Sequence, residues 1–329
     1  EMQRSLVGSE MCIRDSHWLN NKRDVSIVRR GYDLFHSIQY MADIIRHLPQ
    51  MRGYDVVQVT NPVFFDLRPE KNWAIFKYLK KHNKKIFLDA LAIDHYYVKA
   101  CLDGKTFRYS DFFVGDRPLP HPEREKMLAA WIGGPNERPN IEMAQEANGI
   151  IACLYEYYAA YQPEYADKLA YIPIPIDLSI NPFHPIKSTP EVVKFFIGIQ
   201  QHRTAIKGTD ILLDVLREIH DKYPCESHIQ KVVSVPFDEY NKLLVDCHIL
   251  LDQLYSYTPA TNALAAMARG IIAVSGAEPE FYNFIGEQKL RPIINVLPDR
   301  NDIFKQLENL IIHCLLYTSD AADEARSVD

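Results

Sequence analysis

The sequence lacks the features that mark membrane, secreted or zinc-binding proteins. No apolar run approaches the roughly 20 residues that a helix needs to cross a bilayer. The six cysteines form no Cys-x-x-Cys pair and have no zinc-site spacing. Nothing in the sequence suggests secretion, so reduced cytosolic thiols are the simplest interpretation.

The two ends of the chain look like translated sequencing adapter. Met11–Ser16 can be encoded by ATGTGTATAAGAGACAG, and Cys314–Thr318 can be encoded by the reverse complement of that string. Selection on a protein does not produce such a relation between distant segments, and it resembles the inverted end of a transposase-based sequencing library. We therefore interpret residues 1–16 and 314–329 as artefact and leave them out of the fold prediction. We expect the natural segment, residues 17–313, to be cut at both ends.

That segment has almost no net charge. The chain has 37 Lys and Arg and 43 Asp and Glu, of which three and seven lie in the flanks, so 34 basic residues stand against 36 acidic ones. This balance gives no electrostatic reason to expect a nucleic acid partner. A segment of about 300 residues normally divides into two domains.

Short β-rich runs alternate with helical periodicity along the chain, which is typical of βαβ units and parallel sheets. In the first half we predict strands at 56–60, 85–90, 149–153 and 169–174 and helices at 34–48, 72–81 and 141–147. In the second half we predict strands at 192–199, 228–235, 248–251 and 271–274 and helices at 207–222, 260–268 and 302–312.

Prolines mark the boundary between the halves. They recur from Pro173 to Pro185, and each pushes the preceding residue toward an extended conformation. We predict an amino-terminal Rossmann-like domain at 17–176 and a carboxy-terminal one at 177–313. Two such halves joined by a stiff linker make a cleft, the usual place for a ligand.

One connection in the second half, residues 198–210, links a strand to a helix and carries basic side chains. Open α/β sheets bind ligands at such loops, where helix N–H groups suit phosphate. Arg203 and Lys207, the latter followed by Gly208, would add positive charge over a diphosphate. The alternative, more frequent for such a loop taken alone, is a surface loop with solvated basic side chains.

A second connection, residues 251–262, also runs from a strand end into a helix. Asp252 and Gln253 are polar where the sheet should open onto the cleft. Thr258 and Thr261 lie near the helix start, beside Asn262. Their hydroxyls could cap the helix or could bind a phosphate with help from the helix dipole.

Three runs in the second half carry a family resemblance: IGIQQHRTAIKGTDILLDVLREI, VPFDEYNKLLVDCHILLDQLY and NALAAMARGIIAVSGAEPEFYNFIG. Together they resemble the donor-binding half of a GT-B glycosyltransferase, in the retaining group that includes glycogen-synthase-like and lipopolysaccharide enzymes. The first half, with RGYDVVQVTNPVF and YEYYAAYQPEYADKLAYIPIPIDL, is similar to the acceptor half of bacterial members, especially from gut Bacteroides-type genomes.

The resemblance implies two Rossmann-like domains facing across a cleft, the first lacking its opening strand. It also implies transfer of a sugar from a nucleotide-diphosphate donor to a glycan, a polysaccharide precursor or a lipid-linked acceptor. Arg203 and Lys207 would contact the diphosphate, and Thr258, Thr261 and Asn262 would contact phosphate or ribose.

Other site residues follow from the same resemblance. Glu278 and Glu280 come directly after the Gly-rich turn of the donor half. His95, or Asp94 beside it, would face the reacting sugar, whereas the alternative is a histidine packed among the neighbouring tyrosines. The connection at 105–111 is a candidate acceptor loop, with a surface segment held by its aromatics as the alternative.

Two carboxylates of the family pattern are missing. Retaining members usually carry Glu-x7-Glu, and the corresponding residues here are Tyr257 and Ala265. The usual Gly-Arg of the first donor loop is Gly198–Ile199, so Arg203 would have to replace that arginine. Two alternatives therefore stay open. One is a catalytically silent GT-B scaffold that binds a glycan or a partner protein, and the other is an isomerase like the nucleotide-sugar 2-epimerases.

The sequence also has no Asp-x-Asp, the carboxylate pair that commonly holds Mg²⁺ on a diphosphate. Its absence agrees with transfer in which cationic side chains and a helix start offset the leaving-group charge. We expect no metal or cofactor apart from the donor substrate. We expect a cytoplasmic location, with peripheral attachment to the inner face of the membrane as a further option.

Overall fold

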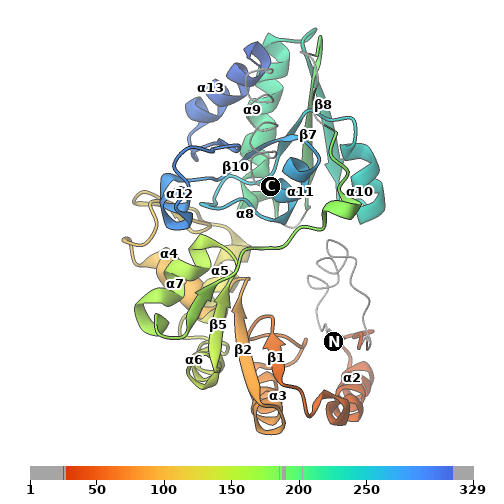
Figure 1. Ribbon diagram of the computed structural model, residues 1–329, viewed down its shortest axis with the longest axis vertical. Coiled ribbons are helices and arrows are strands. Elements are labelled where there is room, and N and C mark those ends of the chain that lie inside the picture. The colour runs from red at the N-terminus through yellow and green to blue at the C-terminus, as the bar shows by residue number, and fades with distance from the viewer. Residues whose placement is uncertain (1–24, 26, 185, 187–189, 202, 314–329) are drawn as a thin grey trace. The chain divides into compact units, whose positions relative to one another are not determined.

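The computed structural model describes residues 25, 27–184, 186, 190–201 and 203–313. The flanks interpreted as adapter, residues 1–16 and 314–329, lie outside this part of the chain. The chain divides into two compact units (Figure 1). Of the described residues, the first unit contains those up to Thr106 together with Glu125–Pro173, and the second contains Phe107–Arg124 together with those from Ile174 to His313.

A parallel sheet forms the centre of the first unit, with the strand order β1-β2-β5-β6 within the described residues. Its strands are β1 (Val56–Val59), β2 (Lys85–Ala90), β5 (Gly149–Ala152) and β6 (Leu169–Tyr171). Its helices are α2 (Leu34–His47), the 3₁₀ turn η1 (Leu48–Met51), α3 (Pro69–His82), α4 (His95–Leu102), α6 (Glu137–Glu146) and α7 (Tyr155–Tyr165). Helix α5 (Pro122–Trp131) begins in the second unit and ends in the first.

The spacing of apolar residues in the sequence explains which side chains of this unit are buried. Alternate residues of β2, including Ile86 and Leu88, are fully buried, as expected for a strand whose side chains point to opposite faces in turn. Helix α3 places Phe76 and Leu79 in the core, on one face of the helix. The predicted strands and helices of this half are confirmed, with ends that shift by a few residues.

The second unit has a parallel sheet in the order β11-β10-β9-β7-β8. Its strands are β7 (Val193–Ile199), β8 (Ser227–Val233), β9 (Ile249–Leu251), β10 (Ile272–Ser275) and β11 (Ile294–Asn295). Its helices are η2 (Leu178–Ile180), α8 (Thr204–Lys207), α9 (Thr209–Lys222), α10 (Phe237–Leu244), α11 (Thr261–Ala268), α12 (Pro279–Ile285) and α13 (Arg300–Ile312). Strand β8 lies on one side of β7, and β9, β10 and β11 follow on the other. The order therefore reverses at β7, and open α/β sheets bind ligands outside the carboxyl ends of the strands at such a switch point.

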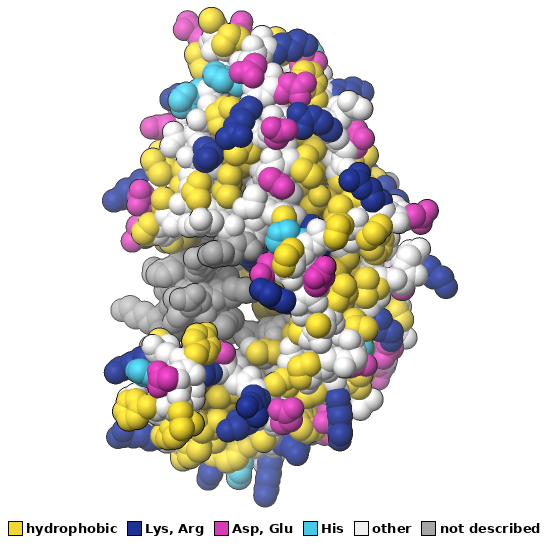
Figure 2. Space-filling model, turned by 180° about the vertical axis from the view of Figure 1, so that it is seen from behind, with side chains coloured by type: hydrophobic (Ala, Val, Ile, Leu, Met, Phe, Trp, Pro, Cys, Tyr) yellow, Lys and Arg dark blue, Asp and Glu magenta, His cyan; other side chains and the backbone are white. Residues whose placement is uncertain are grey.

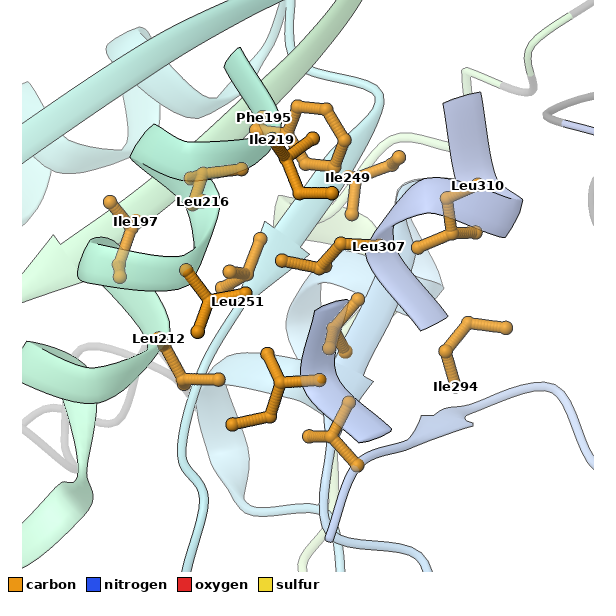
Figure 3. Packing of buried hydrophobic residues seen from close by; sticks show 14 of the residues in the cluster. Phe195, Ile197, Leu212, Leu216, Ile219, Ile249, Leu251, Ile294, Leu307 and Leu310 are labelled. Atoms are coloured by element: carbon orange, nitrogen blue, oxygen red, sulfur yellow. The ribbon is translucent and has the colours of Figure 1, made fainter. Parts of the chain in front are cut away.

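Helices cover both faces of this second sheet. Phe195 and Ile197 of β7 point into the larger core cluster, which α9 and α13 complete, whereas Phe196 points into a smaller cluster with α10 and α11. Figure 3 shows side chains of α9 and α13 meeting those of β7 and β9. Each fully buried Leu, Ile or Phe contributes about 1.5–3 kcal/mol, so this core fixes the strand ends that carry the polar loops.

One segment is placed differently from the sequence prediction. Residues Phe107–Arg124 group with the second unit, although the predicted limits 17–176 assign them to the amino-terminal domain. They contain the hairpin β3 (Phe113–Val114) and β4 (Arg117–Pro118), and Val114 and Leu119 pack against the core of the second unit. Apolar side chains of the segment are thus buried on the second unit, a contact between distant residues that local patterns do not encode.

Charged side chains of both signs are interspersed over the face of the molecule shown in Figure 2, in keeping with the near-neutral charge count. None of the helices that the structure describes combines the length and apolar composition that crossing a bilayer requires.

A buried carboxyl group, Asp89 of β2, should make the stability of the first unit depend on pH. Asp89 is 2% exposed, and its two oxygens accept hydrogen bonds from Gln58 Nε2 at 2.9 and 2.8 Å. Burial raises the pKa of Asp89 to about 7, and the hydrogen bonds from Gln58 offset only part of that rise. Because the unfolded pKa is about 3.9, the folded state binds this proton more tightly, and stability falls as the pH rises from about 4 to about 7.

We expect this one group to remove up to ~4 kcal/mol of unfolding free energy across that window. In Asp89→Asn that part of the pH dependence should disappear, because residue 89 no longer titrates. Urea unfolding at a series of pH values measures it, with Asp55→Asn as a control, since Asp55 is exposed on the same unit. Equal pH slopes for the wild type and Asp89→Asn would show that Asp89 does not carry the effect.

Candidate functional site

The carboxyl ends of β7, β9 and β10 bring three polar loops together in the second unit. Lys207 follows β7, and its Nζ lies 3.6 Å from Oδ1 of Asp252, the residue directly after β9. Asn262 Nδ2, at the start of α11, donates to the same Oδ1 at 3.2 Å, and Tyr240 donates its hydroxyl to Asn262 Oδ1 at 2.8 Å. The structure thus brings three of the predicted donor-site residues, Lys207, Asp252 and Asn262, into direct contact.

Gly208 lets the first two loops approach each other. Its φ of 69° is in the left-handed region, and a Cβ there would lie 2.7 Å from Leu254 Cβ. The neighbouring Lys207 carbonyl accepts a hydrogen bond from Leu254 N at 2.8 Å. The predicted site residue Gly208 therefore acts here through the backbone, by permitting this close packing.

Arg203 lies one helical turn before Lys207, and Lys207 N donates to its carbonyl at 2.9 Å. Within the described part of the chain, no hydrogen bond or ion pair engages its guanidinium group. Gln253 and Thr258 lie on the β9–α11 connection, and Thr261 opens α11.

The start of α11 is not capped by a side chain. The N-cap residue is Ala260, so neither Thr258 nor Thr261 takes the capping role. The first hydrogen bond within the helix is from Leu264 N to Ala260 O, at 3.0 Å. The amide groups before Leu264 have no intrahelical acceptor, and with the positive end of the helix dipole they suit an anion.

Four buried polar atoms near these strand ends have no hydrogen-bond partner among the described residues: Gln200 Oε1, Asp252 Oδ2, Ser256 Oγ and Ser275 Oγ. Asp252, Ser256 and Ser275 are 2%, 5% and 0% exposed. The four residues end or follow the adjacent strands β10, β9 and β7, and β7 is the strand at which the order reverses. Buried polar groups are nearly always hydrogen-bonded, so this concentration indicates a place that a polar ligand or ordered water completes.

Glu278 and Glu280 hold the segment Phe107–Arg124 in place. Arg108 forms ion pairs with both carboxylates, at 3.0 Å for Glu280. Tyr109 donates its hydroxyl to Glu278 Oε1 at 2.6 Å, and Asn295 Nδ2 donates to the same oxygen at 2.8 Å. Burial and the bond to Glu278 raise the pKa of Tyr109 well above its usual value, which keeps the phenol protonated as a donor. Both predicted donor-binding glutamates are thus engaged within the protein.

The two positions of the missing carboxylates are filled by packed side chains. Tyr257 is 2% exposed, accepts a hydrogen bond from Arg108 N at 2.6 Å, and has its ring centroid 4.9 Å from that of Tyr109. Ala265 is fully buried in α11. Neither can act as a carboxylate toward a ligand.

In the first unit, the geometry separates the two predicted catalytic residues. Asp94 is the N-cap of α4 and is fully buried, with Oδ1 accepting from Tyr97 N at 2.9 Å and Oδ2 from the Tyr161 hydroxyl at 2.7 Å. Burial raises the pKa of Asp94 to about 6, although these hydrogen bonds lower it in part. Both oxygens already serve the fold, so Asp94 has a structural role here.

His95 keeps one ring nitrogen available. Its Nδ1 lies 3.0 Å from the Trp131 carbonyl oxygen, which can only accept, so Nδ1 carries the hydrogen. Neutral His95 then has a lone pair on Nε2, and no partner for that atom occurs among the described residues. His95 is 7% exposed.

Sequence reasoning missed Ser256, Ser275 and Tyr240. Ser275 offered only a weak signal, a single polar residue at the end of an apolar strand. Arg108 and Tyr109 lie in the candidate acceptor loop at 105–111, but their contacts with Glu278 were not predicted, because the partners are far apart in the sequence. Among the described residues, no group of three or more His, Cys, Asp or Glu side chains is placed to hold a metal ion.

No protein-family model matches the chain, and no curated protein matches its sequence. Solved structures do match its fold. A mutant of S. aureus TarM, in complex with fondaparinux, alpha-GlcNAc-glycerol and UDP, aligns with a TM-score of 0.54 and 14% identity, over 88% of this chain and 55% of TarM. WaaG, a glycosyltransferase involved in lipopolysaccharide biosynthesis, aligns at 0.51 and 13% identity, over 93% of this chain and 82% of WaaG.

A third match is a proposed UDP-N-acetylglucosamine 2-epimerase from Listeria monocytogenes. It aligns with a TM-score of 0.51 and 7% identity, over 97% of this chain and 82% of the epimerase. At these identities the likeness concerns the fold alone. The chain has the predicted GT-B fold, with two Rossmann-like α/β units.

Proposed function

We propose that the second unit binds a nucleoside-diphosphate sugar and that the protein transfers the sugar to a glycan, a polysaccharide precursor or a lipid-linked acceptor. The observation that carries the proposal is the group of four unpartnered buried polar atoms at the switch point. A ligand rich in hydroxyl and phosphate groups offers both the donors and the acceptors that these atoms lack.

Lys207 and Arg203 are the proposed diphosphate ligands. The 3.6 Å separation between Lys207 Nζ and Asp252 is long for a hydrogen bond, which leaves the ammonium donors of Lys207 for a second anion. The amide groups at the start of α11 would bind a phosphate beside it, together with the hydroxyls of Thr258 and Thr261. The presence of UDP in the TarM complex supports this class of ligand and makes UDP the first nucleotide to test.

The proposed transfer needs positive charge beside the oxygen that joins the sugar to the donor phosphate. During transfer the bond between the anomeric carbon and the donor phosphate oxygen breaks, and its electrons remain on the leaving diphosphate. Cationic groups fixed beside that oxygen stabilise the developing charge without a metal ion. His95 of the first unit, through Nε2, is the side chain that we propose for contact with the sugar. Retention of anomeric configuration belongs to the proposal on family likeness alone.

A second candidate is a catalytically silent scaffold that binds a glycan or a partner protein. It is favoured by the packed Tyr257 and Ala265 at the positions of the family carboxylates. The epimerase-like isomerase also stays a candidate, because the same fold occurs in the Listeria protein.

One experiment distinguishes the transferase, the silent scaffold and the isomerase. The chain is incubated with UDP-, GDP- and ADP-sugars that carry a labelled sugar, with and without a mixture of glycan acceptors. A transferase moves the label to an acceptor and releases the nucleoside diphosphate. An isomerase forms a new nucleotide sugar without an acceptor. Binding without turnover would overturn the transferase proposal and leave the scaffold.

A further inference from the structure

A pocket lies in the second unit, away from the switch point. Its volume is about 210 Å³, and it opens between the linker around Ile180 and His184 and the ends of α10 and α11. Arg269 ends α11 and precedes β10, so the pocket is at the amino ends of the strands. The candidate donor site is at their carboxyl ends.

The charged side chains that line this pocket are both basic. Lys242 and Arg269 line it together with the polar His184 and Asn241, and no acidic residue of the described chain does. The other lining side chains, such as Ile180 and Val245, are apolar. The pocket therefore offers positive charge and hydrogen-bond donors beside an apolar wall.

Arg269 is held firmly but is only partly satisfied. It is 8% exposed, and its Nη2 donates to Asn241 Oδ1 at 2.8 Å. Its backbone is fixed as well, since its N donates to Ala266 O at 3.0 Å and its carbonyl accepts from His184 N at 2.9 Å. Its Nη1 is buried and has no partner among the described residues.

A buried guanidinium without a carboxylate is unfavourable. Burial lowers the pKa of Arg269, and only the nearby Tyr240 acts against this. The carbonyl end of α11 offsets part of the cost through the helix dipole. An anion beside Nη1 would supply the remaining interaction, because charge-assisted hydrogen bonds to Arg are the strong ones.

We propose that this pocket is a binding site for a small anion with an apolar body, namely a carboxylate or phosphate group on an aromatic or short aliphatic carrier. The anionic group contacts Arg269 and Lys242, and the carrier packs against Ile180 and Val245. An apolar cavity of about 150 Å³ is enough to hold benzene, so a carrier of that size fits. The proposal does not depend on the proposed transferase activity.

Calorimetric titration of the chain with four probes tests this. The probes are benzoate, phenyl phosphate, inorganic phosphate and benzyl alcohol. We expect benzoate and phenyl phosphate to bind, and Arg269→Met to weaken both by at least about tenfold. Inorganic phosphate should bind more weakly than phenyl phosphate, and binding of benzyl alcohol should not respond to the substitution.

Three further variants make the result specific. Arg217→Met removes an exposed arginine of α9 and should leave the binding of all probes unchanged. Lys207→Met alters the candidate donor site and should also leave benzoate binding unchanged, which separates this proposal from the proposed function. Lys242→Met changes an exposed side chain, so it should fold even if Arg269→Met does not, and it should weaken benzoate binding several-fold.

Two results would overturn the proposal. One is no binding of any anionic probe at about 10 mM, where even a very weak site would fill. The other is benzoate binding that neither Arg269→Met nor Lys242→Met changes.

Discussion

Replacing Lys207 with methionine is expected to weaken the binding of a nucleoside diphosphate by about 10- to 100-fold, because a charge-assisted contact to phosphate contributes about 1.5–3 kcal/mol. Lys207 Nζ lies 3.6 Å from Asp252 Oδ1, and the Lys207 side chain is 20% exposed. Calorimetric titration of the variant with UDP measures the loss.

Two further variants serve as controls for this prediction. Lys222→Met removes a lysine of the same unit that pairs with Glu308 at 2.6 Å, and it should leave UDP affinity unchanged. The single variant Lys207→Met leaves the buried Asp252 carboxylate without its ion-pair partner. The double variant Lys207→Met/Asp252→Asn removes both charges, so it should fold without a buried unpaired carboxylate. If Lys207→Met and Lys207→Met/Asp252→Asn both bound UDP as well as the wild type, Lys207 would not be a diphosphate ligand.

A substitution at Gly276 is expected to lower the free energy of unfolding by about 3 kcal/mol, a large cost for adding one methyl group. In Gly276→Ala the new Cβ would lie 1.6 Å from the Ser256 carbonyl oxygen and 2.5 Å from its hydroxyl. The β9–α11 connection must therefore move, and Ser256 with it. Thermal or urea unfolding measures the loss of stability, and UDP affinity should fall as well.

Gly286→Ala is the matched control for that prediction. Gly286 has a φ of 75°, and apart from its chain neighbours no described residue comes within 4 Å of an added Cβ, so only backbone strain of about 1–2 kcal/mol is expected. Its position beyond α12 leaves the Ser256 turn in place, so ligand affinity should not change. Equal losses of stability in the two variants would mean that the contact with Ser256 is not the cause.

The fold could be predicted because its elements carry local patterns. The short apolar run of β7 and the apolar stripe of α9 occur in the sequence itself, and the structure places both elements where the sequence predicted them. The start of α4 was missed. No helix was predicted after the strand at 85–90, whereas Asp94 caps one there through its side chain.

The candidate site was predictable only where it follows strand ends. Lys207 and Asp252 come after β7 and β9, and their contact depends on those two strands being neighbours, which the sequence does not state. Thr258 and Thr261 were recognised as helix-start residues, but Ala260 takes the N-cap position and leaves the helix start uncapped. Because the N-cap residue is Ala260, no side chain accepts a hydrogen bond from the first amide groups of α11, and these amide groups suit an anion.

Local sequence patterns could not predict contacts between residues that are far apart in the chain. Arg108 donates to Tyr257, a residue 149 positions away. Glu278 then appears in the sequence as an accessible donor-site acid, while in the folded chain Arg108, Tyr109 and Asn295 surround it. Only the tertiary structure shows that Phe107–Arg124 belongs with the second unit.

We infer that the second unit holds a nucleoside-diphosphate site at its switch point. Calorimetric titration of the chain with UDP, GDP, ADP and CMP tests this claim. We expect saturable one-to-one binding of one nucleoside diphosphate, with weaker binding of the monophosphate CMP. Absence of binding by all four nucleotides, in a chain that circular dichroism shows to be folded, would contradict the claim.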